Sequence, residues 1–67
     1  MDNAQKAPLY QVWATETATG KPVPVPFFPR MAKEVVEEYA SCMRMAIASG
    51  NEKRYSNPEV LQHLSLT

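Results

Sequence analysis

Few side chains in this chain have the chemistry that catalysis or metal binding requires. The only histidine is His63 and the only cysteine is Cys42. A catalytic base needs an oriented partner and a pocket, and zinc sites use recognisable spacings of cysteine and histidine ligands. His63 and Cys42 show no such spacing, so we expect no metal site. Cys42 falls within an apolar helical stripe, which predicts a buried and unreactive thiol.

The carboxylates also give little support for acid–base chemistry. Glu34, Glu37 and Glu38 lie close together in one segment, but a patch of this kind is routine on the solvated face of a helix. Gly20 and Gly50 are the only glycines, so the chain has no glycine-rich phosphate loop. We therefore expect no catalytic residues, no cofactor and no small-molecule substrate, and we expect that the protein is not an enzyme.

The charge balance bears on nucleic-acid binding. Seven Lys and Arg balance seven Asp and Glu, and affinity for a phosphate backbone depends on excess positive charge. An alternative interpretation is a weak nucleic-acid-binding accessory factor that uses cations and aromatic side chains on a hairpin. Tyr10, Trp13 or Tyr55 would be available for stacking. The cationic contacts would be Lys21, Arg30, Lys33, Lys53 and Arg54. The even balance favours scattered solubilising charges, so nucleic acid is the less favoured partner.

The first element that would position these side chains is a strand over residues 9–15. It is rich in aromatic and β-branched residues, which suit a pleated, half-buried surface. Alternation along a strand divides its side chains between two faces. One face holds Tyr10, Val12 and Ala14, and the other holds Leu9, Gln11, Trp13 and Thr15. A single helix cannot cover both faces, so Trp13 needs a cover from elsewhere.

A turn at residues 16–21, closed by Gly20, predicts a hairpin to a second strand at about residues 21–28. Successive residues of a strand direct their backbone groups to opposite neighbours. The prolines at 22, 24 and 26 therefore all lack a donor on the same side, while the intervening residues can pair with the first strand. That arrangement is typical of a protected edge strand. A polyproline II segment without sheet pairing is the alternative.

A long amphipathic helix is predicted at about residues 30–49, opened by Pro29 and ended by Gly50. Its apolar residues recur at spacings of three and four. They are Ala32, Val35, Val36, Tyr39, Cys42, Met43, Ala46 and Ile47. Further on, Ser56 and Glu59 have the spacing of a capping box, and Asn57 could instead cap a helix that Pro58 begins. Either signal predicts a short C-terminal helical turn at about residues 58–64.

These elements predict an α+β fold, with a single small domain at residues 9–64. A flexible N-terminal arm is expected at residues 1–8 and a frayed C-terminus at 65–67. No apolar run is long enough to cross a bilayer, and a lone thiol fits a reducing compartment. We therefore expect a cytoplasmic protein that does not enter a membrane.

An isolated hairpin is marginal in water, which suggests association with a second chain. Because the prolines leave the outer side of the second strand without donors, the edge that can still pair is predicted to be residues 9–15. Two copies would then pair this strand across a two-fold axis and form a homodimer. The residues of that strand are Leu9, Tyr10, Gln11, Val12, Trp13, Ala14 and Thr15. The expected function is that of a small non-catalytic protein-interaction or accessory protein, and the sequence indicates no particular protein partner.

Overall fold

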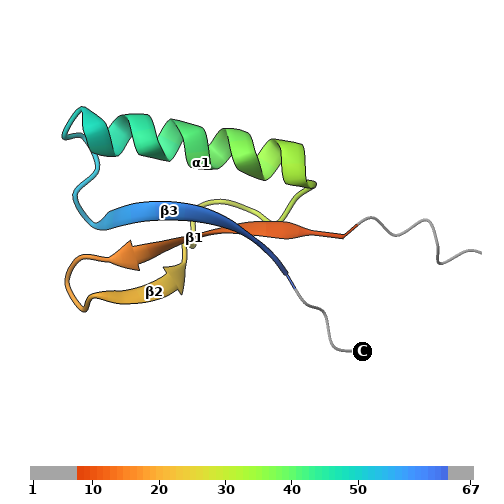
Figure 1. Ribbon diagram of the computed structural model, residues 1–67, viewed down its shortest axis with the longest axis horizontal. Coiled ribbons are helices and arrows are strands. Elements are labelled where there is room, and N and C mark those ends of the chain that lie inside the picture. Colours follow the sequence, from red (N-terminus) through yellow and green to blue (C-terminus); the bar gives the residue numbers. More distant parts are fainter. Residues whose placement is uncertain (1–7, 64–67) are drawn as a thin grey trace, which may run out of the picture.

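The chain forms a three-stranded antiparallel sheet with one helix packed on one of its faces (Figure 1). The computed structural model describes residues 8–63, so most of the expected N-terminal arm and all of the expected frayed C-terminus lie outside the described residues. The elements in chain order are β1 (Tyr10–Glu16), β2 (Lys21–Pro24), α1 (Lys33–Ala48) and β3 (Tyr55–Gln62). The sheet order is β2-β1-β3, which places β1 in the centre. The predicted α+β class is confirmed.

The hairpin between β1 and β2 forms as the glycine and the prolines predict. Gly20 adopts a positive φ of 74°, and its N–H donates to the carbonyl of Glu16 at 2.7 Å. The N–H of Val25 donates to the carbonyl of Val12 at 2.9 Å, so the residues between the prolines bond to β1. The prolines of β2 therefore direct their donorless side away from β1. The polyproline II alternative is wrong at β2, although the strand ends at Pro24 and not near residue 28.

The helix begins three residues later than expected, at Lys33. The N–H of Tyr10 donates to the carbonyl of Met31 at 2.8 Å, and the N–H of Met31 donates back at 3.2 Å. This isolated bridge holds Met31 in extended backbone beside β1, so helical geometry starts only after Ala32. At the other end, α1 stops at Ala48 and Gly50 takes a positive φ of 84°, as the predicted stop requires.

The predicted helical turn at residues 58–64 is wrong, because Tyr55–Gln62 form strand β3. Asn57 adopts a left-handed φ of 54° and caps no helix. The register with β1 passes from Thr15↔Ser56 to Trp13↔Glu59, so two residues of β3 stand opposite one residue of β1. That insertion is a β-bulge, which absorbs Pro58 without breaking the ladder.

The expectation that residues 9–15 form an open edge is also wrong. β3 pairs antiparallel with β1 from Tyr10↔Gln62 to Trp13↔Glu59, on the side that β2 leaves free. Two copies could pair through Leu9–Thr15 only after β3 had left the sheet. The structural basis for a dimer at this strand is therefore lost, while dimerisation itself stays a prediction.

The core lies between α1 and one face of the sheet. Its buried members come from β1, from the connection after β2 and from α1. They are Val12, Ala14, Val25, Val36, Ala40 and Met43. The predicted stripe on α1 is right at Val36 and Met43, but Cys42 is exposed. Cys42 precedes Met43 by one residue and so lies about 100° further around the helix, beyond the arc that the sheet covers.

Candidate protein-interaction face

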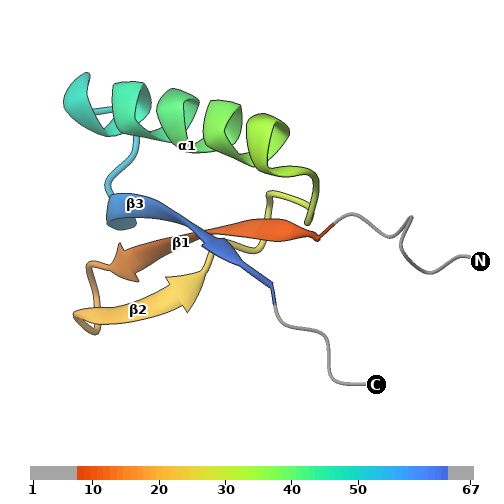
Figure 2. The same cartoon turned by 45° about the vertical axis from the view of Figure 1, so that its right-hand side comes forward.

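No described helix or strand covers the face of the sheet opposite α1 (Figures 1 and 2). Because Val12 and Ala14 point toward the helix, their neighbours along β1 point to the other side. Directly opposed residues in the ladder share a face, so the register gives the remaining members. We call this surface the open face; its residues are Leu9, Gln11, Trp13, Thr15, Pro22, Pro24, Ser56, Glu59, Leu61 and His63.

Trp13 lies at the centre of the open face. It stands opposite Pro24 of β2 and opposite Glu59 of β3, so neighbouring strands hold it on both sides. Its side chain is half-buried, while Leu9 and Leu61 are 44% and 42% exposed. On the same face, Gln11 and Thr15 lie next to Trp13 along β1, and Pro22 and Leu61 lie on its diagonals, so the tryptophan stands among both apolar and polar side chains.

A shallow hollow opens beside Trp13, where the bulge displaces β3. Its volume is about 50 Å³. Its lining residues are Trp13, Ala14, Thr15, Pro22, Asn57, Glu59 and Leu61. Small-molecule sites commonly have roughly 300–1,000 Å³, so this hollow suits one inserted side chain and no complete ligand.

The five cations considered for nucleic-acid binding do not converge. Lys21, Lys53 and Arg54 lie at the end of the sheet that holds the hairpin turn, as the pairing of Glu16 with Lys21 and Tyr55 requires. The other two, Arg30 and Lys33, lie at the N-terminal end of α1. That helix has 16 residues and spans about 24 Å. The strand positions of the open face include no lysine and no arginine.

Three of these cations have acidic or amide partners within the chain. Arg54 Nη2 lies 3.1 Å from Glu52 Oε1, and Lys33 Nζ lies 4.0 Å from Glu37 Oε2. Arg30 Nε donates to Gln11 Oε1 at 3.3 Å. These contacts leave less positive charge available to a phosphate backbone.

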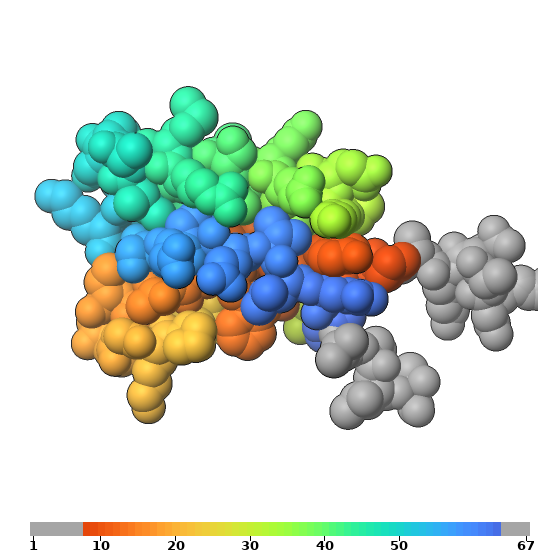
Figure 3. Space-filling view, in the orientation of Figure 1, coloured from red at the N-terminus to blue at the C-terminus, as the bar shows by residue number. Residues whose placement is uncertain are grey.

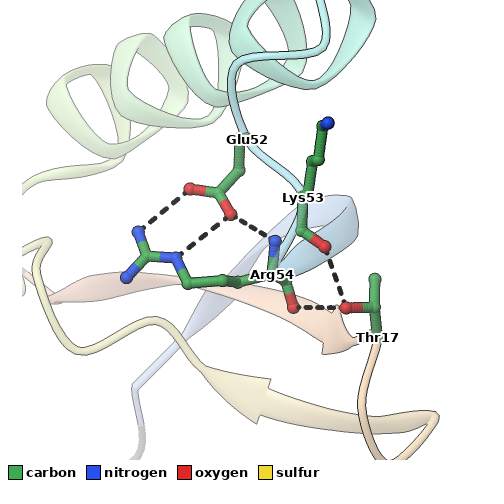
Figure 4. A network of polar contacts seen from close by, with 4 residues as sticks. All are labelled: Thr17, Glu52, Lys53 and Arg54. Atoms are coloured by element: carbon green, nitrogen blue, oxygen red, sulfur yellow. Dashed lines mark hydrogen bonds and ion pairs between the residues drawn. The ribbon is translucent and has the colours of Figure 1, made fainter.

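The connection between α1 and β3 is tied to the hairpin turn by a polar network (Figure 4). The Thr17 hydroxyl lies 2.9 Å from the Lys53 carbonyl oxygen and 3.1 Å from that of Arg54. The backbone N–H of Arg54 donates to Glu52 Oε2 at 2.7 Å. The side-chain and backbone hydrogen bonds from Arg54 lower the pKa of the Glu52 carboxyl.

An aromatic row fixes the connection between β2 and α1 on the helix side of the sheet. Phe28 stacks on Tyr39 with ring centroids 4.9 Å apart, and Phe27 contacts Phe28 at 4.8 Å. The Arg54 guanidinium lies over Phe27 at 5.4 Å and over Tyr55 at 5.8 Å. These contacts anchor Arg54 within the fold, which is a structural role.

Within residues 8–63, no group of three or more His, Cys, Asp or Glu is placed to hold a metal ion. Cys42 lies exposed on α1, and His63 lies just after β3 on the open face, so the fold does not bring them into one site. In the same part of the chain, no helix is long and apolar enough to span a membrane.

Alternation along residues 9–15 predicted that Leu9, Gln11, Trp13 and Thr15 share one face of the strand. The contribution of Glu59 and Leu61 from β3 was not predicted, because that segment was expected to be helical. The only local signal for a strand here is the β-branched Val60, because polar and apolar residues do not alternate from Glu59 to Gln62.

Comparisons of this chain with protein-family models, with curated proteins and with solved structures give no match.

Proposed function

We propose that this protein is a non-catalytic interaction protein that binds another protein through the open face. The observation that supports the proposal is the group of Leu9, Trp13 and Leu61 on a sheet face that no described helix or strand covers (Figure 2). Exposed apolar side chains grouped on an uncovered face often mark a protein-interaction site. Tryptophan at the centre of a surface is also the residue type most enriched among binding hot spots.

The chemistry of the open face indicates the kind of partner. Its strand positions carry Glu59 as their only carboxylate, and they carry no lysine or arginine. The one described cation that contacts this face is Arg30, whose Nε donates to Gln11 Oε1 at 3.3 Å, so a phosphate backbone would find little positive charge there. The hollow beside Trp13 would accept one aliphatic side chain, and Pro22 presents a rigid apolar ring at its margin. A protein surface with a protruding leucine, isoleucine or methionine fits these features best.

The experiment uses Trp13 both as the target and as the reporter, because it is the only tryptophan. Proteins retained from a lysate of the source cells are compared for the native chain, for Trp13→Gln and for Met45→Gln. Met45 is 69% exposed on α1 and is the matched control. A retained protein is then purified and titrated against each form, with the emission of Trp13 followed in the native chain.

We expect one partner to bind the native chain and Met45→Gln equally, with a blue shift of the tryptophan emission. Trp13→Gln should weaken binding about 30-fold or more, which corresponds to about 2 kcal/mol for a central hot spot. Binding that is indifferent to Trp13, or retention of nucleic acid with a steep salt dependence, would contradict the proposal.

A further inference from the structure

The outer edge of β3 carries backbone donors and acceptors that pair with no other strand of the described residues. The N–H of His63 donates to the carbonyl of Leu9 at 2.8 Å. Leu61 and Glu59 lie two and four residues before His63, so their backbone groups also point toward β1. Because backbone groups alternate in direction, those of Val60 and Gln62 point away from β1. β3 is an edge strand of the sheet, and Figure 3 shows it running across the front of the molecule with no other described element over it.

The remaining strand edges are closed within the described residues. β1 is paired on both sides, and the outer side of β2 lacks donors at its prolines. The first half of β3 is interrupted by the bulge, where Pro58 has no N–H and its carbonyl accepts a hydrogen bond from Arg44 Nη2 at 3.1 Å. Only the flat segment from Glu59 to Gln62 keeps an edge that can extend the sheet, and such edges pair readily with another strand.

We infer that two copies of this chain pair antiparallel through this segment of β3, about a two-fold axis at Leu61. In that register Val60 of each copy lies opposite Gln62 of the other, and both residues exchange N–H and C=O bonds. Leu61 lies opposite its own equivalent, where side chains approach within about 4.5–5.5 Å between Cβ atoms. An axis at Val60 instead would set Gln62 against Pro58, which cannot donate and whose carbonyl Arg44 occupies.

The pattern of charges along β3 favours a second copy over an unrelated strand. Glu59, Leu61 and His63 share the open face at alternate positions. Antiparallel pairing about Leu61 sets each glutamate opposite the partner's histidine, on both sides of the leucine pair. The segment is therefore complementary to itself in charge and in shape, as a two-fold interface requires. The chain also has no net charge that would oppose association.

This dimer differs from the surface named in the proposed function. Pairing through the edge joins two three-stranded sheets into one and leaves both open faces side by side and uncovered. The inference therefore does not depend on the open face binding a partner. Glu59, Leu61 and His63 belong to both surfaces, so the test also includes Gln62, which pairs with Tyr10 and lies outside the open face.

The test measures the dimer dissociation constant by sedimentation velocity at pH 6, over a concentration series from low micromolar to near millimolar. The variants are Glu59→His, His63→Glu and the double swap of both. Each single change should set like charges opposite each other at two symmetric places and weaken the dimer about tenfold. The double swap should return the constant to within about threefold of the native value, because the pairs are opposite in charge again.

Gln62→Pro tests the backbone pairing by itself. The N–H of Gln62 points outward, so its removal costs no bond to β1, and we expect the dimer to be lost while circular dichroism and the melting temperature stay near native. A chain that is monomeric throughout the series would overturn the inference. A dimer that is unaffected by Gln62→Pro and by the single charge changes, but abolished by Trp13→Gln, would show instead that the copies associate through their open faces.

Discussion

The local sequence at Asn57 is compatible with two structures, a helix start and a left-handed turn, and only long-range pairing selects between them. Asparagine before proline is a common start of a helix, and it is also one of the few residues that tolerate left-handed backbone. Here Asn57 has a φ of 54° within the bulge of β3. The backbone conformation at this one position determines whether the chain after Pro58 continues along β1 or turns away from it.

Replacing Asn57 tests this backbone conformation. Asn57→Ala should lower the free energy of unfolding by about 1 kcal/mol, because alanine reaches positive φ only with steric strain. Asn57→Gly should be close to neutral, since glycine adopts this region without strain. Urea unfolding of both variants provides the comparison. Equal losses for alanine and glycine would mean that the asparagine side chain, and not its backbone conformation, stabilises the bulge.

Among the elements, the two connections of the helix are held by different means. The connection from β2 is fixed by stacked aromatic rings, and the connection to β3 is fixed by charged and polar contacts around Glu52 and Arg54. The polar connection is therefore the part of the fold that should respond to pH.

The two outer strands of the sheet also have different edges. The edge of β2 is closed by its prolines, and the edge of β3 is partly open beyond its bulge.

The pKa of Glu52 is lowered in the folded chain by hydrogen bonds from Arg54, so its carboxylate favours the folded state above the pKa of the unfolded chain, about 4.3. That stabilisation is lost as the pH falls through the lower folded pKa. Glu52→Gln should therefore unfold at a lower urea concentration than the native chain at pH 7, and the difference should shrink toward pH 3. The exposed Glu38→Gln serves as control. A difference that is constant with pH would show that the charge of Glu52 does not contribute.

For the whole molecule, a single small core supports the sheet, the helix and both candidate surfaces. Sixty-seven residues bury only a modest share of their surface, so each core side chain is a large part of the total stability. A second chain at the β3 edge, or a partner on the open face, would add buried area that one copy alone lacks. Association and stability are thus expected to rise together.

Two methionines on α1 allow a matched test of this core. Met43 is 3% exposed and Met45 is 69% exposed. Met43→Ala should cost about 2–4 kcal/mol because it leaves a cavity, which approaches the full stability of a small domain. Met45→Ala should change the free energy of unfolding by no more than about 0.5 kcal/mol. Thermal unfolding followed by circular dichroism measures both, and similar losses would show that α1 packs by another face.

The sequence by itself determined the features that depend on near neighbours. Gly20 closes the hairpin, alternate prolines leave β2 with one bonding side, and Gly50 ends the helix, because each follows from backbone chemistry within a few residues. The placement of Trp13 on the face opposite Val12 followed from alternation alone. These features account for the hairpin, the main helix and half of the open face.

Only the tertiary structure decided which strand has an open edge, where α1 begins and which side of α1 is covered. β3 reaches β1 from more than forty residues away, Met31 is held extended by Tyr10, and the sheet covers too narrow an arc to include Cys42. Local patterns cannot resolve such contacts, because Ser56–Glu59 suit a helix start and a bulged strand equally well. The long-range pairing of β3 with β1 selects the strand, and the open edge of the sheet moves with it from Leu9–Thr15 to β3.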